Sequence, residues 1–247
     1  MEPIKVCRHC GKAYKMQSFT VLGITKSIQV PQCSCISKIE ERQKIENEKE
    51  QKRIILEKKF KNSMMTPLFR EKSFDMVDDS EPKSKCMEYT RSFEPKKSGG
   101  LSLIGNIGTG KTTLLACICN ELMQKGYNCL FTQLTDLLDK FSAARRSSDE
   151  RAEEKLLNWL LEFDFVVLDD IGREKYTETR LELVFKIVDK LISHKIPISI
   201  TANPEMITKL KKIAEFEAVL DRLNEACQLK FEFNGTSFRR KNLQNVS

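Results

Sequence analysis

One stretch of this sequence has the residue types and spacing that bind phosphate. It fits the P-loop pattern G-x-x-x-x-G-K-[ST] and reads Gly105, Asn106, Ile107, Gly108, Thr109, Gly110, Lys111, Thr112. Glycines let the backbone turn tightly, so that successive N–H groups point into one concavity. Lys111 would reach the β- and γ-phosphates, and the Thr112 hydroxyl would ligate Mg²⁺. The stretch, together with the neighbouring Thr113, therefore predicts a site for ATP and Mg²⁺.

The structure that this motif requires is predicted on both sides of it. Residues 101–104 form an apolar run that suits a buried strand, and residues 113–123 repeat apolar residues at helical spacing. This helix would end at Lys125 and Gly126, a basic last turn followed by a C-capping glycine. Glycine-rich turns also join strands to helices without a ligand. A Lys-Thr pair in register with strand and helix nevertheless favours phosphate binding.

Two adjacent carboxylates follow another predicted strand, residues 165–168. The strand ends in Asp169, Asp170, Ile171 and Gly172, which is a Walker B arrangement. Ligands of open α/β sheets lie beyond the C-terminal ends of the strands, where the P-loop also lies. Asp169 would bind Mg²⁺, usually through its water, and Asp170 would orient or deprotonate the attacking water. Paired acids after a strand also serve as a cap or turn, but the P-loop upstream favours catalysis.

A polar residue lies just beyond a further predicted strand, residues 197–201. Asn203 would lie at the strand tip beside the two acids, where its side chain can hydrogen-bond a γ-phosphate or the attacking water. Asn203 is also a good N-cap, since Pro204 follows at the first helical position. One side chain can do both at different stages.

Four cysteines crowd into a polar N-terminal segment. Cys7 and Cys10 belong to a C-x-x-C-G turn, and Cys33 and Cys35 follow two short predicted strands within residues 19–30. So small a segment cannot bury enough surface to fold unaided, so we expect a tetrahedral Zn²⁺ on the four thiolates. The alternatives are His9 in place of one thiolate, and free thiols. The cysteines within apolar runs are expected in the core: Cys117, Cys119, Cys129.

Size and charge set further bounds on the protein. The 247 residues are 40% hydrophobic, which is enough for a large core and a small appendage. The net charge of +7 favours an acidic partner such as nucleic acid. No run approaches the roughly 18 apolar residues of a membrane span, and no apolar signal segment is present. We therefore expect a cytoplasmic protein without membrane contact.

The chain divides into three predicted parts. Residues 1–37 form the zinc module, and residues 38–63 form a helical linker of mixed charge with few apolar positions. Residues 64–247 form the nucleotide domain, in which strands and helices alternate after Gly100. The expected strands of its sheet are residues 101–104, 128–132, 165–168, 197–201 and 229–233.

Several motifs occur together and in order in this domain. After the P-loop come Asp-Asp-Ile-Gly at 169–172, Thr-Ala-Asn-Pro at 201–204, Asp-Arg-Leu at 221–223 and Ser-Phe-Arg-Arg at 237–240. The set resembles the DnaC/DnaI-type helicase loaders of bacteria and phages, a branch of the AAA+ ATPases that includes the IstB transposition helpers. The resemblance covers about residues 64–240. It implies an α/β fold with a P-loop AAA+ ATPase core and a five-stranded parallel sheet. The cysteine module and helix look like the helicase-binding portion of some loaders.

The same resemblance implies roles for further residues. It makes Asn203 sensor 1, Arg222 an arginine finger that reaches the γ-phosphate of a neighbouring subunit, and Arg239 the sensor 2 residue, for which the adjacent Arg240 is the alternative. A surface arginine paired with Glu225 is the alternative for Arg222. Most AAA+ enzymes have glutamate where this chain has Asp170, which favours a slow, switch-like ATPase. The implied catalytic set is Lys111, Asp170, Asn203 and Arg222.

Three functions are compatible with these features. The first is an ATP-dependent loader that binds the replicative hexameric DNA helicase and single-stranded DNA during replication initiation, and that forms an oligomer alone or only on the helicase. The second is an IstB-like transposition helper ATPase that binds duplex DNA. The third is a nucleotide-binding adaptor with negligible hydrolysis. The zinc module and charged helix favour the first, because an ATPase that binds only DNA has less need of a separate docking domain.

Overall fold

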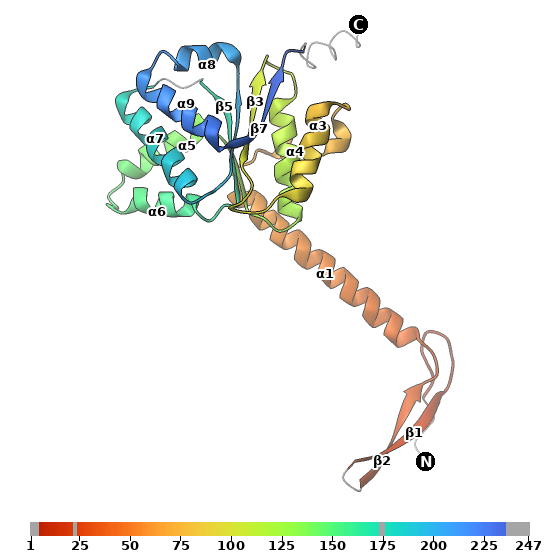
Figure 1. The fold of residues 1–247 in the computed structure, drawn as a ribbon. Helices are drawn as coiled ribbons and strands as arrows, with labels where there is room; N and C mark the ends of the chain where they lie inside the picture. Colours follow the sequence, from red (N-terminus) through yellow and green to blue (C-terminus); the bar gives the residue numbers. More distant parts are fainter. Residues whose placement is uncertain (1–4, 22–23, 173–175, 236–247) are drawn as a thin grey trace. The chain divides into compact units, whose positions relative to one another are not determined.

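We describe a computed structural model of the chain over residues 5–21, 24–172 and 176–235. The chain splits into two compact units, Met1–Ile55 and Leu56–Ser247. Figure 1 shows a hairpin and a long helix at the N-terminal end of the chain, and a sheet flanked by helices in the remainder. Each unit is described by itself.

The N-terminal unit contains one antiparallel hairpin and most of one helix. Strands β1 (Tyr14–Val21) and β2 (Ile24–Pro31) pair along their whole length. The predicted strands, residues 19–25 and 28–30, were shorter and placed differently. The longer pairing brings hydroxyl side chains together across the strands, Ser18 with Ser27 at 2.7 Å. Periodicity could not reveal this pairing, because the hairpin has no buried face that would impose regular alternation on its sequence.

Helix α1 (Cys35–Asn62) begins earlier than the predicted linker. It includes the last cysteine of the N-terminal cluster as its first residue. No residue of α1 is fully buried, as expected of a mixed-charge helix. Within the second unit, Leu56 and Phe60 pack against the hydrophobic core. The Lys59 ammonium also donates to the Gly126 carbonyl at 2.7 Å. The last turns of α1 therefore belong to the nucleotide domain.

The second unit is built on a five-stranded parallel sheet in the order β4-β5-β6-β3-β7. The bounds are β3 Gly100–Gly105, β4 Cys129–Gln133, β5 Phe165–Ile171, β6 Ile198–Ala202 and β7 Cys227–Phe233. The predicted five-stranded parallel sheet is confirmed. β6 lies between β3, which leads to the P-loop, and β5, which carries the two acids. Side chains from all three strands can therefore meet at one edge of the sheet.

Helices cover both faces of this sheet (Figure 1). Side chains of β5 alternate between the faces: Val166 and Leu168 enter one hydrophobic cluster, Phe165 and Val167 the other. The first cluster is completed by α5, α6, α7 and α9, the second by α3 and α4. The helices are α2 Pro67–Arg70, η1 Phe74–Met76 (3₁₀), α3 Glu81–Ser92, α4 Lys111–Gln124, α5 Leu134–Arg145, α6 Ala152–Leu160, α7 Glu178–Ser193, α8 Pro204–Leu210 and α9 Ala214–Ala226.

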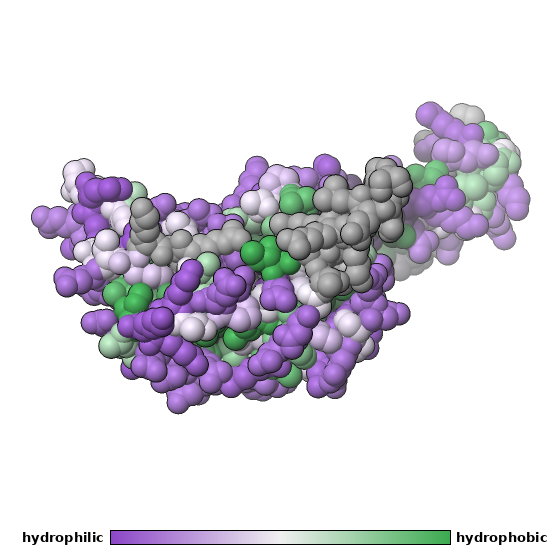
Figure 2. Space-filling view, turned by 90° about the horizontal axis from the view of Figure 1, so that it is seen from above, coloured by the Kyte–Doolittle hydropathy of each residue, from purple (hydrophilic) through white to green (hydrophobic). Residues whose placement is uncertain are grey.

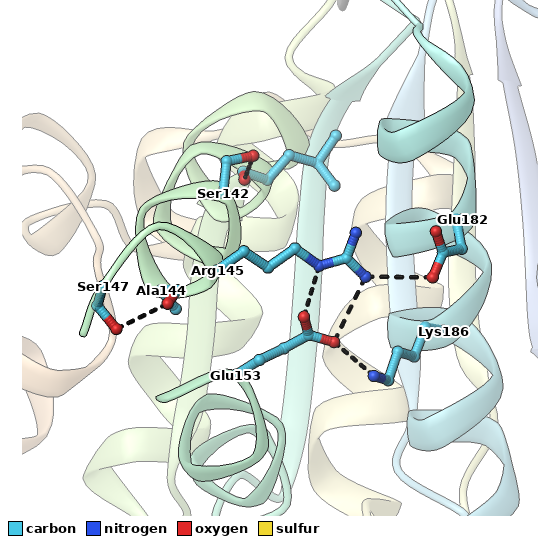
Figure 3. A network of polar contacts seen from close by, with 8 residues as sticks. Ser142, Ala144, Arg145, Ser147, Glu153, Glu182 and Lys186 are labelled. Atoms are coloured by element: carbon cyan, nitrogen blue, oxygen red, sulfur yellow. Dashed lines mark hydrogen bonds and ion pairs between the residues drawn. The ribbon is translucent and has the colours of Figure 1, made fainter. Parts of the chain in front are cut away.

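A polar network joins α5, α6 and α7 (Figure 3). Arg145, the last residue of α5, bonds Glu153 of α6 and, at 3.3 Å, Glu182 of α7. Lys186 of α7 also pairs with Glu153. The cations hold the pKa of the Glu153 carboxyl below its usual range, Arg145 foremost. This carboxylate therefore links three helices that are also joined through the apolar core.

The cysteines expected in the core are buried there, as are Cys86 and Cys227. The segment before the sheet also packs on the core, with Phe74 buried and the Phe69 ring 5.5 Å from that of Phe131. Across the part of the chain that the structure describes, no helix is both long and apolar enough to cross a membrane.

Candidate nucleotide site and cysteine cluster

The P-loop joins β3 to α4 with the backbone that its glycines permit. Gly108 and Gly110 have φ of 80° and 88°, in the left-handed region that other residues rarely adopt. Gly110 is the N-cap of α4, and no side chain caps this helix end. The first-turn N–H groups of α4 are therefore available to an anion, and the helix dipole favours negative charge there. This geometry fits a bound phosphate.

The Lys111 side chain lies buried within the loop. Its ammonium donates to the carbonyl oxygens of Gly105 and Asn106, at 2.8 and 2.6 Å. Carbonyl dipoles solvate a cation without neutralising its charge, so an anion in the loop would be attracted to it. The Thr109 hydroxyl bonds the Asn106 carbonyl at 2.9 Å and closes the turn. The loop is thus held by its own residues, with a cation at its centre.

Close contact with the edge strand β7 fixes the start of the loop. A Cβ atom on Gly105 would lie 2.3 Å from the Phe233 carbonyl oxygen, so only glycine fits between β3 and β7 here. The next residue, Asn106, donates its N–H to the same oxygen at 3.1 Å. The fifth strand therefore supports the position of the phosphate loop.

The two acids lie at an irregularity in the sheet. β5 pairs with β6 up to Leu168, opposite Ile200, and resumes at Ile171, opposite Ala202. This is three steps along β5 against two along β6, which defines a β-bulge. Asp170 lies in the bulge with φ of 61°, a conformation that aspartate tolerates better than most residues. Neighbours in a regular strand point to opposite faces of the sheet, and the bulge removes this constraint from the two acids.

Thr201 of β6 holds the bulge together. Its hydroxyl accepts the N–H of Asp170 at 2.8 Å, which the bulge has displaced from the sheet ladder. The same hydroxyl donates to Asp169 Oδ1 at 2.7 Å. Sequence reasoning named Thr201 only as the first residue of the Thr-Ala-Asn-Pro motif and gave it no role. The further signal was a polar residue inside an apolar strand.

Asp169 connects the Walker B strand to the P-loop. Its Oδ1 atom also accepts the Thr112 hydroxyl at 3.0 Å, so the two predicted Mg²⁺ ligands lie in contact. Burial raises the pKa of the Asp169 carboxyl, while the hydrogen bonds from Thr201 and Thr112 and the charge of Lys111 lower it. A buried carboxylate beside a hydroxyl is the donor set that Mg²⁺ prefers, and the ion would stabilise the charged form.

Asn203 lies at the tip of β6, where it was predicted. Its side-chain oxygen accepts the N–H of Glu205 at 3.1 Å and caps α8, with Pro204 at the first helical position. This is the capping geometry foreseen as the alternative to a sensor. The amide nitrogen makes no hydrogen bond within the described residues. It is therefore the group left to contact a phosphate or water, and the sensor role stays a prediction.

The two predicted arginines are placed differently. Arg222 lies on α9, where it pairs with Asp189 and lies 4.8 Å from the centre of the Phe185 ring. Its ion-pair partner is on α7, so the supposed pair with Glu225 is wrong. The cause is packing, because α7 and α9 lie side by side and present Asp189 to the guanidinium. Arg239 lies outside the described residues, and its role stays a prediction.

The four N-terminal cysteines converge on one point. Their sulfur atoms all lie within 4.8 Å of one another. The first pair is presented by a turn in which Gly11, with φ of 70°, donates its N–H to the Cys7 carbonyl at 2.8 Å. Cys35 is the first residue of α1, where the helix dipole favours a thiolate. His9 is absent from the cluster found among the described residues.

The four thiols of this cluster cannot all be deprotonated unless a cation offsets their negative charge. Backbone N–H groups of His9 and Cys10 lower the pKa of the Cys7 thiol to about 6. Side-chain hydrogen bonds with Cys10 and Cys33 raise the pKa of the Cys35 thiol to about 12, and burial and the negative charge of the two neighbouring sulfurs act in the same direction. A cation among the four sulfurs would remove this conflict, and four thiolates suit a soft divalent metal such as Zn²⁺. The arrangement fits a metal without identifying it.

Comparison with known proteins gives relatives in two groups. The replicative helicase loader DnaC of Escherichia coli K12 is 29% identical over 196 residues, which are 78% of this chain and 79% of that protein. The loader DnaI of Bacillus subtilis is 29% identical over 62% of this chain and 52% of its own length. A putative insertion sequence ATP-binding protein of Sinorhizobium fredii is 32% identical over 59% of this chain and 48% of its own.

Solved structures share the fold, and a family model matches the sequence. A crystal structure of the DnaC helicase loader has a TM-score of 0.59 at 20% identity, covering 68% of this chain and all of that one. AMPPCP-bound DnaA of Aquifex aeolicus has a TM-score of 0.57 at 16% identity, covering 74% of this chain and 56% of that one. The model of the IstB-like ATP-binding proteins matches residues 38–246. This chain, an AAA+ fold with a P-loop and paired acids at one sheet edge, therefore belongs to the IstB-like ATP-binding protein family.

Proposed function

We propose that this protein is an ATPase that loads the replicative hexameric DNA helicase onto single-stranded DNA. The observation that carries the proposal is the contact between Thr112 and Asp169 beside Lys111, in a chain related along most of its length to DnaC. A contact between the two motifs is what nucleotide-controlled action requires, because the P-loop and the acids must respond to the same ligand.

Each residue of the site has a proposed task. Lys111 and the first-turn N–H groups of α4 bind the β- and γ-phosphates. Thr112 and Asp169 hold Mg²⁺, which when bound supplies positive charge to the phosphate oxygens. Asp170 orients the attacking water and accepts its proton, and Asn203 positions that water or the γ-phosphate from the tip of β6.

Arg222 completes the proposed site of a neighbouring subunit. Within its own chain it is paired with Asp189 on the surface, with no contact to the P-loop among the described residues. Hydrolysis would therefore be slow in the monomer and faster in an assembly, either of this protein alone or on the helicase. An arginine supplied by a neighbour raises hydrolysis by about 10³ to 10⁵ in well-studied GTPases. Arg239 is the proposed sensor 2.

The N-terminal unit is the proposed helicase-docking part, held by Zn²⁺ on the four cysteines. The second candidate is a transposition helper, favoured by the insertion sequence relative at 32% identity. A helper of this kind would recognise duplex DNA and a transposase rather than a helicase ring.

Purified partners separate the two functions. The full chain with ATP should bind the replicative helicase of the cell in which it acts and should leave the transposase of a family insertion sequence unbound. Lys111→Ala should abolish ATP binding, whereas Asp170→Asn should keep ATP bound and uncleaved. Binding to the transposase alone would establish the second candidate. Hydrolysis by Asp170→Asn at the unmutated rate would refute the assignment of the carboxylate.

A further inference from the structure

The β1–β2 hairpin has two faces of different chemistry. Side chains alternate along each strand, and residues paired across the strands lie on the same face. One face carries the hydroxyl pairs Ser18–Ser27 and Thr20–Thr25, at 2.7 and 3.0 Å. The opposite face is rich in large apolar side chains, and we call these four the apolar face: Phe19, Val21, Ile24, Ile28.

The apolar face is largely open to solvent. Phe19, Val21, Ile24 and Ile28 are 42%, 59%, 64% and 51% exposed. None of the four belongs to a hydrophobic cluster of the described residues. Figure 2 shows hydrophobic surface next to hydrophilic surface on the N-terminal unit, at the right of the view. Apolar side chains gathered in one place, rather than scattered singly, indicate an interaction site.

The charge around the hairpin restricts its partner. From residue 5 to residue 37 the sequence has no acidic residue, and its basic residues are Lys5, Arg8, Lys12, Lys15, Lys26. Lys15 and Lys26 lie on the same side of the hairpin as the apolar face. A second copy of the chain would bring like charges together. Phe19 and the three aliphatic side chains outnumber the two lysines of this face and bond no phosphate oxygens. An acidic protein surface with an apolar centre fits both features.

We propose that the apolar face is the surface by which this chain grips the helicase, entering an apolar groove with carboxylates at its rim. The inference rests on the proposed function, because the helicase is the occupant. The family model matches residues 38–246, so the hairpin lies outside the matched ATPase part. The choice of helicase is therefore set by the N-terminal segment and not by the common ATPase core.

Matched substitutions on the two faces test the proposal. Ile28 on the apolar face and Met16 on the opposite face are 51% and 55% exposed, so serine at either position changes a similarly exposed apolar side chain. In titrations of the full chain with purified helicase, Ile28→Ser and Phe19→Ser should weaken binding about tenfold or more, as for central interface residues. Met16→Ser should leave it unchanged. Lys26→Glu should weaken it most at low salt.

Metal content and ATP binding report whether each variant keeps its fold. If a serine variant does not fold, helicase binding by Lys26→Glu still tests the proposal. Helicase binding by Ile28→Ser and Lys26→Glu that equals that of Met16→Ser would overturn the inference while leaving the proposed function intact. A wild-type chain that does not bind helicase would remove the proposed function and the occupant with it. If Ile28→Ser and Lys26→Glu lose affinity for single-stranded DNA but keep their affinity for helicase, the face binds DNA, and the inference is also overturned.

Discussion

Replacing Thr201 by valine removes one buried hydroxyl and keeps the shape of the side chain. At neutral pH the Asp169 carboxylate loses a charge-assisted hydrogen bond, which is worth about 1.5–3 kcal/mol. The Asp170 N–H loses its acceptor inside the bulge, which costs about 1–3 kcal/mol if no water replaces it. We expect the free energy of unfolding to fall by about 2.5–6 kcal/mol, the sum of the two losses and a large share of the roughly 5–15 kcal/mol typical of a domain.

The loss should depend on pH. Because burial raises the pKa of Asp169 in the folded state, folding takes up a proton between the unfolded and folded pKa values. Stability therefore falls as the pH rises through this window and levels off above the folded pKa. The Thr201 hydrogen bond lowers the folded pKa, so its removal raises that pKa and enlarges the fall. Below the window the carboxyl is neutral, and the lost bond is worth only about 1 kcal/mol.

Urea unfolding of the full chain at several pH values measures this difference. Thr132→Val is the matched control, because Thr132 is equally buried in β4 but its hydroxyl donates to the Gln133 carbonyl and touches no carboxylate. The control should lose about 1 kcal/mol at every pH. A Thr201→Val loss that is constant with pH, or no larger than that of the control, would refute the reasoning.

Further perturbations give clear outcomes. Cys33→Ser should lower bound zinc, measured by elemental analysis, from one per full chain to well below that; retained metal would disprove the four-cysteine site. Arg222→Ala should bind ATP but lose the rise of specific activity with protein concentration, and an equal mixture with Lys111→Ala should recover part of it if the site is shared. Gly105→Ala should destabilise the domain by about 1–3 kcal/mol through displacement of β7, measured by thermal unfolding. Glu153→Gln should cost at most about 1 kcal/mol, because the network of Arg145 and Lys186 is partly exposed.

The parts of the fold that follow local rules were predictable from the sequence. Buried parallel strands read as short apolar runs, so all five strands of the sheet were placed close to their observed bounds. The P-loop was located correctly because its motif contains glycines, and few other residue types adopt the positive φ values that the loop requires. The resemblance supplied what patterns alone do not, namely that the strands form one parallel sheet.

Other features depend on partners distant in sequence. The bulge at Asp170 arises because β5 has one more residue than β6 between two paired positions. The sequence of neither strand shows this difference by itself. Thr201 acquires its importance only through that mismatch. Arg222 pairs with Asp189 because two amphipathic helices pack together, and local spacing pointed instead to Glu225. The hairpin strands escaped accurate prediction because both of their faces are exposed, so no burial pattern marks them.

The bulge also means that catalysis and stability make opposed demands on β5. Removing one residue at position 170 would restore continuous pairing with β6, relieve a left-handed backbone conformation and leave no N–H that requires the Thr201 hydroxyl. Selection for thermostability alone should therefore find shortened variants of this strand that fold well and no longer cleave ATP. Retention of the extra residue under such selection would indicate that the nucleotide site is still in use.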